Sequence, residues 1–215
     1  MVRDLLSVSI NQFQSDCLQL CEHHYPTVHN RGMREYHMGK ALCRRIISTM
    51  KQADINATLV KSPSEENQEQ PVFTIETPHF YILVIAHRLD SANLGRREAL
   101  LQSISAACKQ TDTDKPQHLL VISDHWFDRS KASKEIPAWW LGHLPANSDE
   151  YIADGIRLQD CAHSLPKSLE QKCALSGGFH EVHHPLKRHG NGKVVHRYLL
   201  LTAYYPLNHV ISSQQ

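Results

Sequence analysis

Apolar residues recur along the chain with two different periods, and each period predicts a kind of element. Spacings of three and four, as at Leu6, Ile10 and Phe13, are typical of an amphipathic helix. Three segments have this helical spacing: 4–22, 33–53 and 95–110. Shorter apolar runs that predict strands lie at 55–62, 72–76, 79–88 and 118–126. The runs at 79–88 and 118–126 are apolar enough for strands buried on both faces of a sheet.

The C-terminal part of the chain departs from this regular alternation. Residues 127–178 are irregular, with one or two short helices expected within 150–173. A β-hairpin is predicted after them, because Asn191-Gly192 favours a tight turn and an apolar run follows it. The order of elements predicts an α/β or α+β fold with a mixed central sheet flanked by helices and a C-terminal β-hairpin. We expect a single domain over 1–215, with 128–150 as the candidate seam.

The predicted hairpin is rich in histidine and in basic residues. If Asn191-Gly192 forms the turn, Val182 faces Leu201 across the two strands. His180 and His184 are then four residues apart on one strand, a separation of roughly 13 Å. That is too far for two bonds of about 2 Å to one zinc ion. We therefore expect a basic, solvated hairpin, and zinc is not an expected cofactor.

Composition and charge narrow the class of protein. The 215 residues are 41% apolar and 21% charged, as in globular proteins. No apolar run reaches the roughly 20 residues that span a bilayer, and the N-terminal residues lack the apolar region of a signal peptide. We expect a cytoplasmic protein with no membrane partner. Six cysteines without a CxxC pair are expected to be reduced.

The predicted helix 33–53 has a basic face. Between His23 and Lys51, six Lys or Arg residues accompany one acid, Glu35. A positive helix face beside a basic hairpin is what binding to a phosphate backbone requires. The side chains expected to contact the phosphates of DNA or RNA are Arg34, Arg44, Arg45, Lys187 and Arg188. The alternative is a solvated face whose charge is balanced by the acidic loop 61–70.

Part of the chain resembles the core of the PD-(D/E)XK nucleases. The resemblance covers about residues 33–125 and rests on the order of elements: a helix with Glu35, a strand, a hairpin, a helix containing GRREALLQ and a strand HLLVIS. It implies that Glu35 and Glu76 hold Mg²⁺, with His87 and Arg88 beside them, so that water attacks a phosphodiester. Ala86 stands where the family has a carboxylate, and Arg88 stands where it has lysine.

This departure predicts either a divergent metal-dependent nuclease or a catalytically reduced relative that binds nucleic acid, of a bacterial mobile-element or defence type. Two alternatives remain open. The hairpin histidines could act as base and acid in metal-independent RNA cleavage, with Lys187 or Arg188 stabilising the charge. A non-enzymatic protein could instead contact a protein partner through the aromatic pair Trp139 and Trp140.

Overall fold

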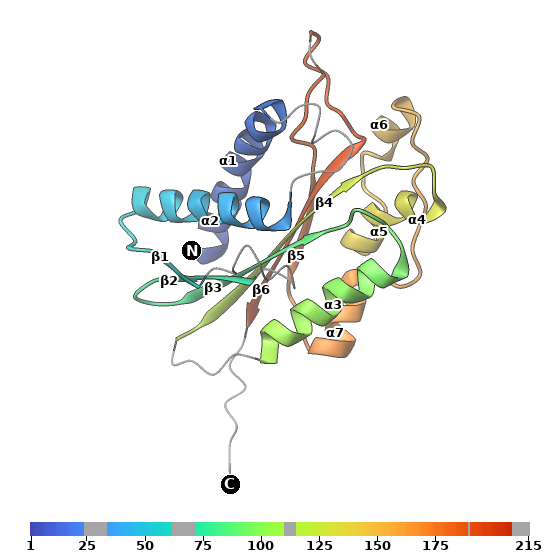
Figure 1. Ribbon diagram of the computed structural model, residues 1–215. Coiled ribbons are helices and arrows are strands. Elements are labelled where there is room, and N and C mark those ends of the chain that lie inside the picture. Colours follow the sequence, from blue (N-terminus) through green and yellow to red (C-terminus); the bar gives the residue numbers. More distant parts are fainter. Residues whose placement is uncertain (24–33, 62–71, 110–114, 189, 208–215) are drawn as a thin grey trace.

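The computed structural model describes the chain except for residues 24–33, 62–71, 110–114, 189 and 208–215, and except for the side chains of 20–23 (Figure 1). Its helices are α1 (Val2–His23), α2 (Glu35–Gln52), α3 (Leu94–Lys109), α4 (Lys131–Lys134), α5 (Ile136–Leu141), α6 (Ser148–Ala153) and α7 (Leu165–Cys173). Its strands are β1 (Thr58–Lys61), β2 (Val72–Glu76), β3 (Tyr81–Arg88), β4 (Gln117–Trp126), β5 (Phe179–His183) and β6 (Tyr198–Leu207). Nearly all of the predicted loop 61–70 lies outside the described residues.

The described strands form one mixed sheet in the order β1-β2-β3-β4-β6-β5. The first three strands form an antiparallel meander, and β3 then pairs with β4 in parallel. Parallel neighbours need a crossover connection, and α3 supplies it. β6 runs antiparallel to β4 on one side and to β5 on the other. The mixed α/β fold with a C-terminal strand pair is therefore as the sequence predicts.

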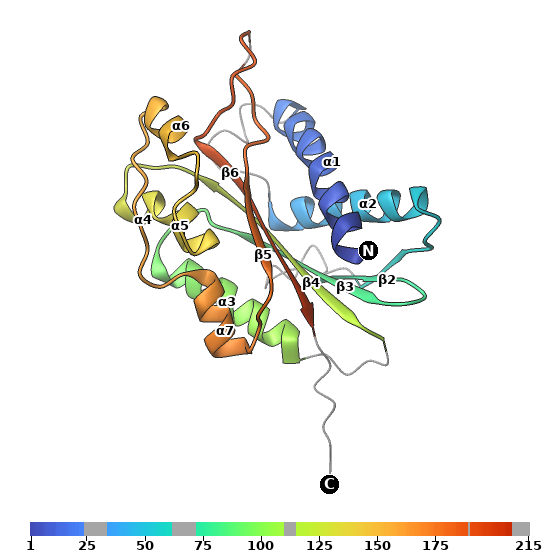
Figure 2. The same ribbon diagram turned by 180° about the vertical axis from the view of Figure 1, so that it is seen from behind.

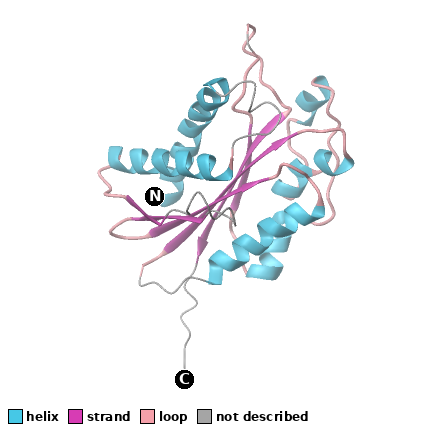
Figure 3. Cartoon of the chain, in the orientation of Figure 1, coloured by secondary structure: helices cyan, strands magenta, loops and turns pink. Residues whose placement is uncertain are grey.

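Helices cover both faces of the sheet (Figures 1, 2 and 3). Side chains alternate between the two faces along each strand, as they must in a pleated sheet. Ile82, Val84 and Ala86 of β3 join the apolar cluster of α1 and α2. Leu83 and Ile85 join the cluster of α3, α5 and α7 on the other face. This double burial confirms the prediction that the segment 79–88 contains a strand covered on both sides.

Helix α2 lies directly on the sheet because it has a glycine at the contact. A Cβ atom at Gly39 would collide with the ring of Phe73 on β2 and would lie 2.9 Å from the Cβ of Ala86 on β3. Without a side chain at this position, the helix backbone can approach both strands closely. The contact places the first turn of α2 near the end of β3.

Residues 127–178 contain more structure than the sequence pattern predicts. Helices α4 and α5 lie between 131 and 141, where only irregular chain is expected. The side chains of Ile136, Trp139 and Trp140 are buried in the same cluster as α3 and α7. Within the predicted seam at 128–150, α5 thus packs on the core of the sheet, whereas most of 142–150 is exposed.

The pairing of β5 with β6 has the predicted register, since Val182 pairs with Leu201. The turn itself differs from the prediction. Beyond β5 the register shifts, because Lys187 pairs with Val194 and the backbone N–H of Arg188 donates to the carbonyl of Lys193 at 2.7 Å. Residues 186–188 and 190–197 form a two-stranded extension of the hairpin, which we call the basic arm. In Figure 1 it rises beyond the ends of α1 and α6.

Candidate functional site

Glu35, His87 and Arg88 come together at the carboxyl end of β3. Glu35 is the first residue of α2, and its Oε1 accepts hydrogen bonds from the backbone N–H of Arg88 at 2.7 Å and from the guanidinium of Arg96 at 3.1 Å. The Nδ1 atom of His87 lies 3.9 Å from the same oxygen. Three of the four predicted catalytic residues therefore meet in one group, which we call the Glu35 cluster.

The Glu35 cluster also contains a residue that the sequence does not single out, Arg96 at the start of α3. Its guanidinium donates to the carbonyl of Arg88 at 2.6 Å, and its Nε lies 3.1 Å from Asp90. His87 is 2% exposed, and its Nε2 lies 3.1 Å from the carbonyl of Arg96. Because a carbonyl only accepts, this nitrogen carries the proton. Burial and then the charge of Arg96 lower the pKa of His87, which favours the neutral imidazole.

Asp124 adds a buried carboxylate beside this group. It is opposite Arg88 in the parallel β3–β4 pair, and its Oδ1 lies 3.8 Å from the Arg88 Nε. Acidic and basic side chains thus alternate through the cluster. Such an arrangement offsets charge within the protein and holds α2, β3 and α3 together. The geometry of the Glu35 cluster thus supports a structural role, in which it connects these three elements, more directly than a role in binding a cation.

Glu76, the other predicted metal ligand, lies at the opposite end of the sheet. It pairs with Tyr81, the first residue of β3, whereas Arg88 is the last. At roughly 3.3 Å per residue, these two ends of β3 are roughly 23 Å apart. The structure therefore does not bring Glu35 and Glu76 together, and the pair does not fit a shared Mg²⁺ ion.

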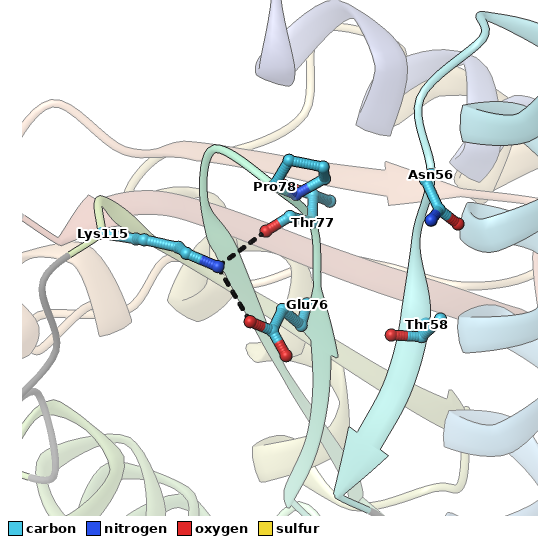
Figure 4. A pocket seen from close by; sticks show the side chains of 6 residues that line it. All are labelled: Asn56, Thr58, Glu76, Thr77, Pro78 and Lys115. Carbon is cyan, nitrogen blue, oxygen red and sulfur yellow. Dashed lines mark hydrogen bonds and ion pairs between the residues drawn. The ribbon is translucent and has the colours of Figure 1, made fainter.

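An open pocket of about 220 Å³ surrounds Glu76 (Figure 4). Lys115 Nζ donates to Glu76 Oε1 at 2.8 Å and to the carbonyl of Thr77 at 3.2 Å, and the Tyr81 hydroxyl donates to the same carboxylate at 3.0 Å. The hydrogen bond from Lys115 is the main reason why the pKa of Glu76 lies below its usual value. Asn56 and Thr58 line the other side of the pocket in Figure 4. Glu76 is thus an ionised acid that already has two donors.

The described residues contain no group of three or more His, Cys, Asp or Glu side chains placed to hold a metal ion. The two predicted magnesium ligands face cationic groups instead, Arg96 at one end of β3 and Lys115 at the other. We derive no catalytic step through Mg²⁺ from this arrangement.

The five predicted phosphate contacts divide into two groups. Arg34, Arg44 and Lys187 are exposed, and no ion pair within the described residues involves them. Arg45 instead binds Asp16 of α1 through two hydrogen bonds, of 2.7 and 2.5 Å, and joins α2 to α1. Arg188 is exposed but reaches Asp154 at 2.8 Å.

The histidines of β5 are not solvated, so the expectation of a wet hairpin is wrong for them. His180 hydrogen-bonds with the hydroxyl of Tyr205 at 2.5 Å, and His183 hydrogen-bonds with that of Thr202 at 2.9 Å. Burial lowers the pKa of both imidazoles from 6.5 to about 4. Each histidine finds a hydroxyl partner on the neighbouring strand, and sequence spacing within β5 alone cannot reveal such partners.

His184 and His196 lie beside each other at the base of the basic arm, with ring centroids 4.8 Å apart. His184 Nε2 lies 2.8 Å from the hydroxyl of Tyr151, and burial lowers the pKa of His184 to about 4. The two nitrogens of His196 lie 3.1 Å from Asp154 and 3.0 Å from Glu150. The pair therefore places a ring that faces a hydroxyl beside a ring whose two nitrogens both face carboxylates.

Trp139 and Trp140 cannot provide the predicted surface for a protein partner, because they are 2% and 0% exposed. The indole N–H of Trp140 donates to the carbonyl of Thr202 on β6 at 3.0 Å. The guanidinium of Arg97 lies over the ring of Trp139. Their role is to join α5 to the sheet, and the prediction of a contact through them is wrong.

Comparison with models of known protein families, with curated proteins and with solved structures gave no match. In the part of the chain that the structure describes, no helix combines the length and the apolar character needed to cross a bilayer.

Proposed function

We propose that this protein binds nucleic acid through phosphate contacts made by exposed cations of α2. The observation that carries the proposal is the distribution of charge on this helix. Arg44 and Lys51 of the helix and Arg34 at its N-cap are exposed, and among the described residues none of them has an acidic partner. Cations left unpaired on one face attract a polyanion and release its counterions on binding.

The spacing on α2 supports a linear contact. His37, Arg44 and Lys51 follow one another at intervals of seven residues, about two helical turns, so they project from one side of the helix. They cover roughly 20 Å along the axis at about 1.5 Å per residue. The buried residues of the helix, Met38 and Leu42 among them, face the sheet instead. A row of this kind follows the backbone of an extended polyanion.

Binding is favoured over metal-dependent cleavage. The acids that the nuclease resemblance assigns to Mg²⁺ lie at opposite ends of β3, and each already faces a cationic side chain. A catalytically reduced protein with a phosphate-binding face is the form of the original hypothesis that this geometry supports.

The test is fluorescence anisotropy with labelled DNA and RNA, single- and double-stranded, over a series of salt concentrations. We expect binding that weakens steeply with salt. The double variant Arg34→Ala/Arg44→Ala should lower the slope of log K against log salt by about two. Its affinity at 0.1 M salt should fall roughly tens-fold, given a slope of about 0.9 per phosphate contact.

The matched control is Lys109→Ala/Lys167→Ala, which removes the same charge from α3 and α7 on the other face of the sheet. Both lysines are exposed and have no ion pair within the described residues. Equal losses of affinity in the two double variants would mean that only the net charge of the protein matters. That result would contradict specific binding through the α2 face. Assays with Mg²⁺ or with EDTA on the same substrates report cleavage independently of binding.

A second candidate, metal-independent RNA cleavage, has support from the neutral His184 beside His196, since one base and one acid are what such a reaction needs. It predicts RNA cleavage that persists in EDTA and is lost in His184→Gln. Both nitrogens of His196 are occupied by carboxylates, and we therefore rank this candidate second.

A further inference from the structure

The basic arm projects from the end of the sheet at which β3 and β4 finish. Trp126, the last residue of β4, pairs with Tyr198, the first residue of β6, and the arm precedes that residue. Leu186 and Val195 at the base of the arm pack in the cluster of α1 and α2. Because Glu35 of α2 also reaches the last residue of β3, the arm and the start of α2 lie towards the same end of the sheet.

The arm is two-stranded and ends in a glycine-rich turn. The N–H of Val195 donates to the carbonyl of Leu186 at 2.9 Å, and the N–H of Gly192 donates to that of Arg188 at 3.1 Å. Gly190 and Gly192 have φ values of 95° and 65°, which side chains disfavour. The chain can therefore reverse direction sharply, and the arm stays narrow.

One carboxylate fixes the arm to the protein body. Asp154 Oδ1 accepts from the guanidinium of Arg188 at 2.8 Å, and its Oδ2 accepts from the backbone N–H of His196 at 3.2 Å and lies 3.1 Å from the ring Nδ1. Burial would raise the pKa of Asp154, but the hydrogen bonds from His196 and the charge of Arg188 lower it, so the ionised form is held. The arm leaves the protein body in a defined direction.

Charge on the arm is of a single sign. No Asp or Glu occurs in the sequence after Glu181. Lys187, Lys193 and Arg197 are exposed, and no ion pair within the described residues involves them. A narrow, anchored and uniformly positive projection matches a concave polyanion.

We infer that the basic arm inserts into the major groove of B-form DNA, and this inference rests on the proposed function. Two paired strands are about 4.8 Å apart, and the major groove is about 12 Å wide and about 8.5 Å deep. The arm runs from the pair of Leu186 and Val195 to the turn closed by Arg188 and Gly192, so its width rather than its length decides which groove it fits. The minor groove, about 6 Å wide, is too narrow. The deep, narrow major groove of an RNA duplex excludes side chains.

The test compares Lys187→Ala/Lys193→Ala with the wild type on a labelled 20-base-pair DNA duplex, the RNA duplex of the same sequence and the single DNA strand. Arg188 is left intact because it anchors the arm. We expect a roughly tens-fold loss of affinity for the DNA duplex at 0.1 M salt, given about 0.9 log units per contact per tenfold change in salt, and a smaller loss for the other two. Methyl green, which occupies the major groove, should compete with the wild type, whereas netropsin in the minor groove should not.

Each outcome separates this inference from the proposed function. Wild-type affinity in the arm variant, together with lost affinity in Arg34→Ala/Arg44→Ala, would overturn groove insertion and leave the α2 face standing. Equal losses on all three nucleic acids, or competition by netropsin alone, would also overturn it. Binding unchanged in both double variants would contradict the arm and the α2 face together. Circular dichroism of both variants checks that the fold is intact.

Discussion

Glu35 has two effects at the first turn of α2. Its negative charge lies at the N-terminus of a helix, where the helix dipole favours an acid. Its Oε1 also accepts from Arg88 and Arg96, which belong to the end of β3 and the start of α3. The sequence marks Glu35 as the only acid of a basic helix, but nothing in the spacing of residues reveals that Arg96 is its partner.

Replacement of Glu35 by alanine should therefore destabilise the protein. The variant leaves the N–H of Arg88 and the guanidinium of Arg96 without their acceptor, and we expect a loss of about 1–3 kcal/mol in the free energy of unfolding. Urea denaturation measures it. The matched control is Glu98→Ala, which removes an exposed pair with Lys172 and should cost at most about 1 kcal/mol. Equal losses of unfolding free energy in the two variants would show that the Glu35 cluster does not hold α2, β3 and α3 together.

The helices and strands of the central sheet follow from apolar periodicity, whereas their separations depend on single side chains. The spacing within 33–53 predicts the helix α2 and its buried face. Gly39 in that segment suggests only a weaker helix, because glycine lowers helix propensity. Its place against Phe73 and Ala86 depends on strands that lie more than 30 residues further along the chain.

Because of the contact at Gly39, replacing Gly39 and replacing Gly95 by alanine should change the free energy of unfolding in opposite directions. Gly39→Ala should lower the free energy of unfolding by about 1–2 kcal/mol, since overpacking of about 1–3 kcal/mol outweighs a helix-propensity gain of at most about 1 kcal/mol. Gly95→Ala, near the start of α3, meets nothing closer than the Asn93 side chain at 3.5 Å and should be neutral or stabilising. Thermal unfolding of both variants measures the signs. A stabilised Gly39→Ala protein would mean that α2 does not lie directly on the sheet.

Across the whole molecule, buried histidines make stability depend on pH. His180, His183 and His184 have folded-state pKa values of about 4, below the ordinary 6.5. Below pH 6.5 these three histidines bind protons in the unfolded chain, whereas in the folded protein they stay neutral until the pH approaches 4. The stabilising contribution is therefore complete above pH 6.5 and is lost as the pH falls towards 4, by up to about 1.4 kcal/mol per pH unit for each group.

Urea denaturation between pH 7.5 and pH 4.5 tests this dependence. The variant His183→Gln retains a polar group near Thr202 but does not titrate, and its free energy of unfolding should fall less steeply with acid than that of the wild type. His37→Gln, which changes an exposed histidine, is the matched control for the loss of an imidazole. Identical slopes for wild type and His183→Gln would contradict a neutral, buried His183.

Much of the architecture is predictable from the sequence, and most of the site is not. Apolar periodicity identifies α1, α2, α3 and the strands of the meander, and the histidine-rich segment has the predicted pairing register. The same periodicity cannot tell whether Trp139 and Trp140 are exposed, because α5 has no repeat long enough to show a buried side. Glu76 lies at the opposite end of β3 from Glu35. The order of helices and strands in the sequence does not reveal that distance.

The position of β6 determines when the sheet can be completed during synthesis of the chain. This strand lies between β4 and β5, yet it comes last in the chain order of the described strands. While the chain emerges N-terminus first from a ribosome, β4 keeps an open edge until residues 198–207 are synthesised. β5 leaves the ribosome earlier but has no other partner in the described sheet. Completion of the sheet is thus postponed until residues 198–207 are synthesised, and a chain that stops at Arg197 would expose the long apolar edge of β4 to aggregation.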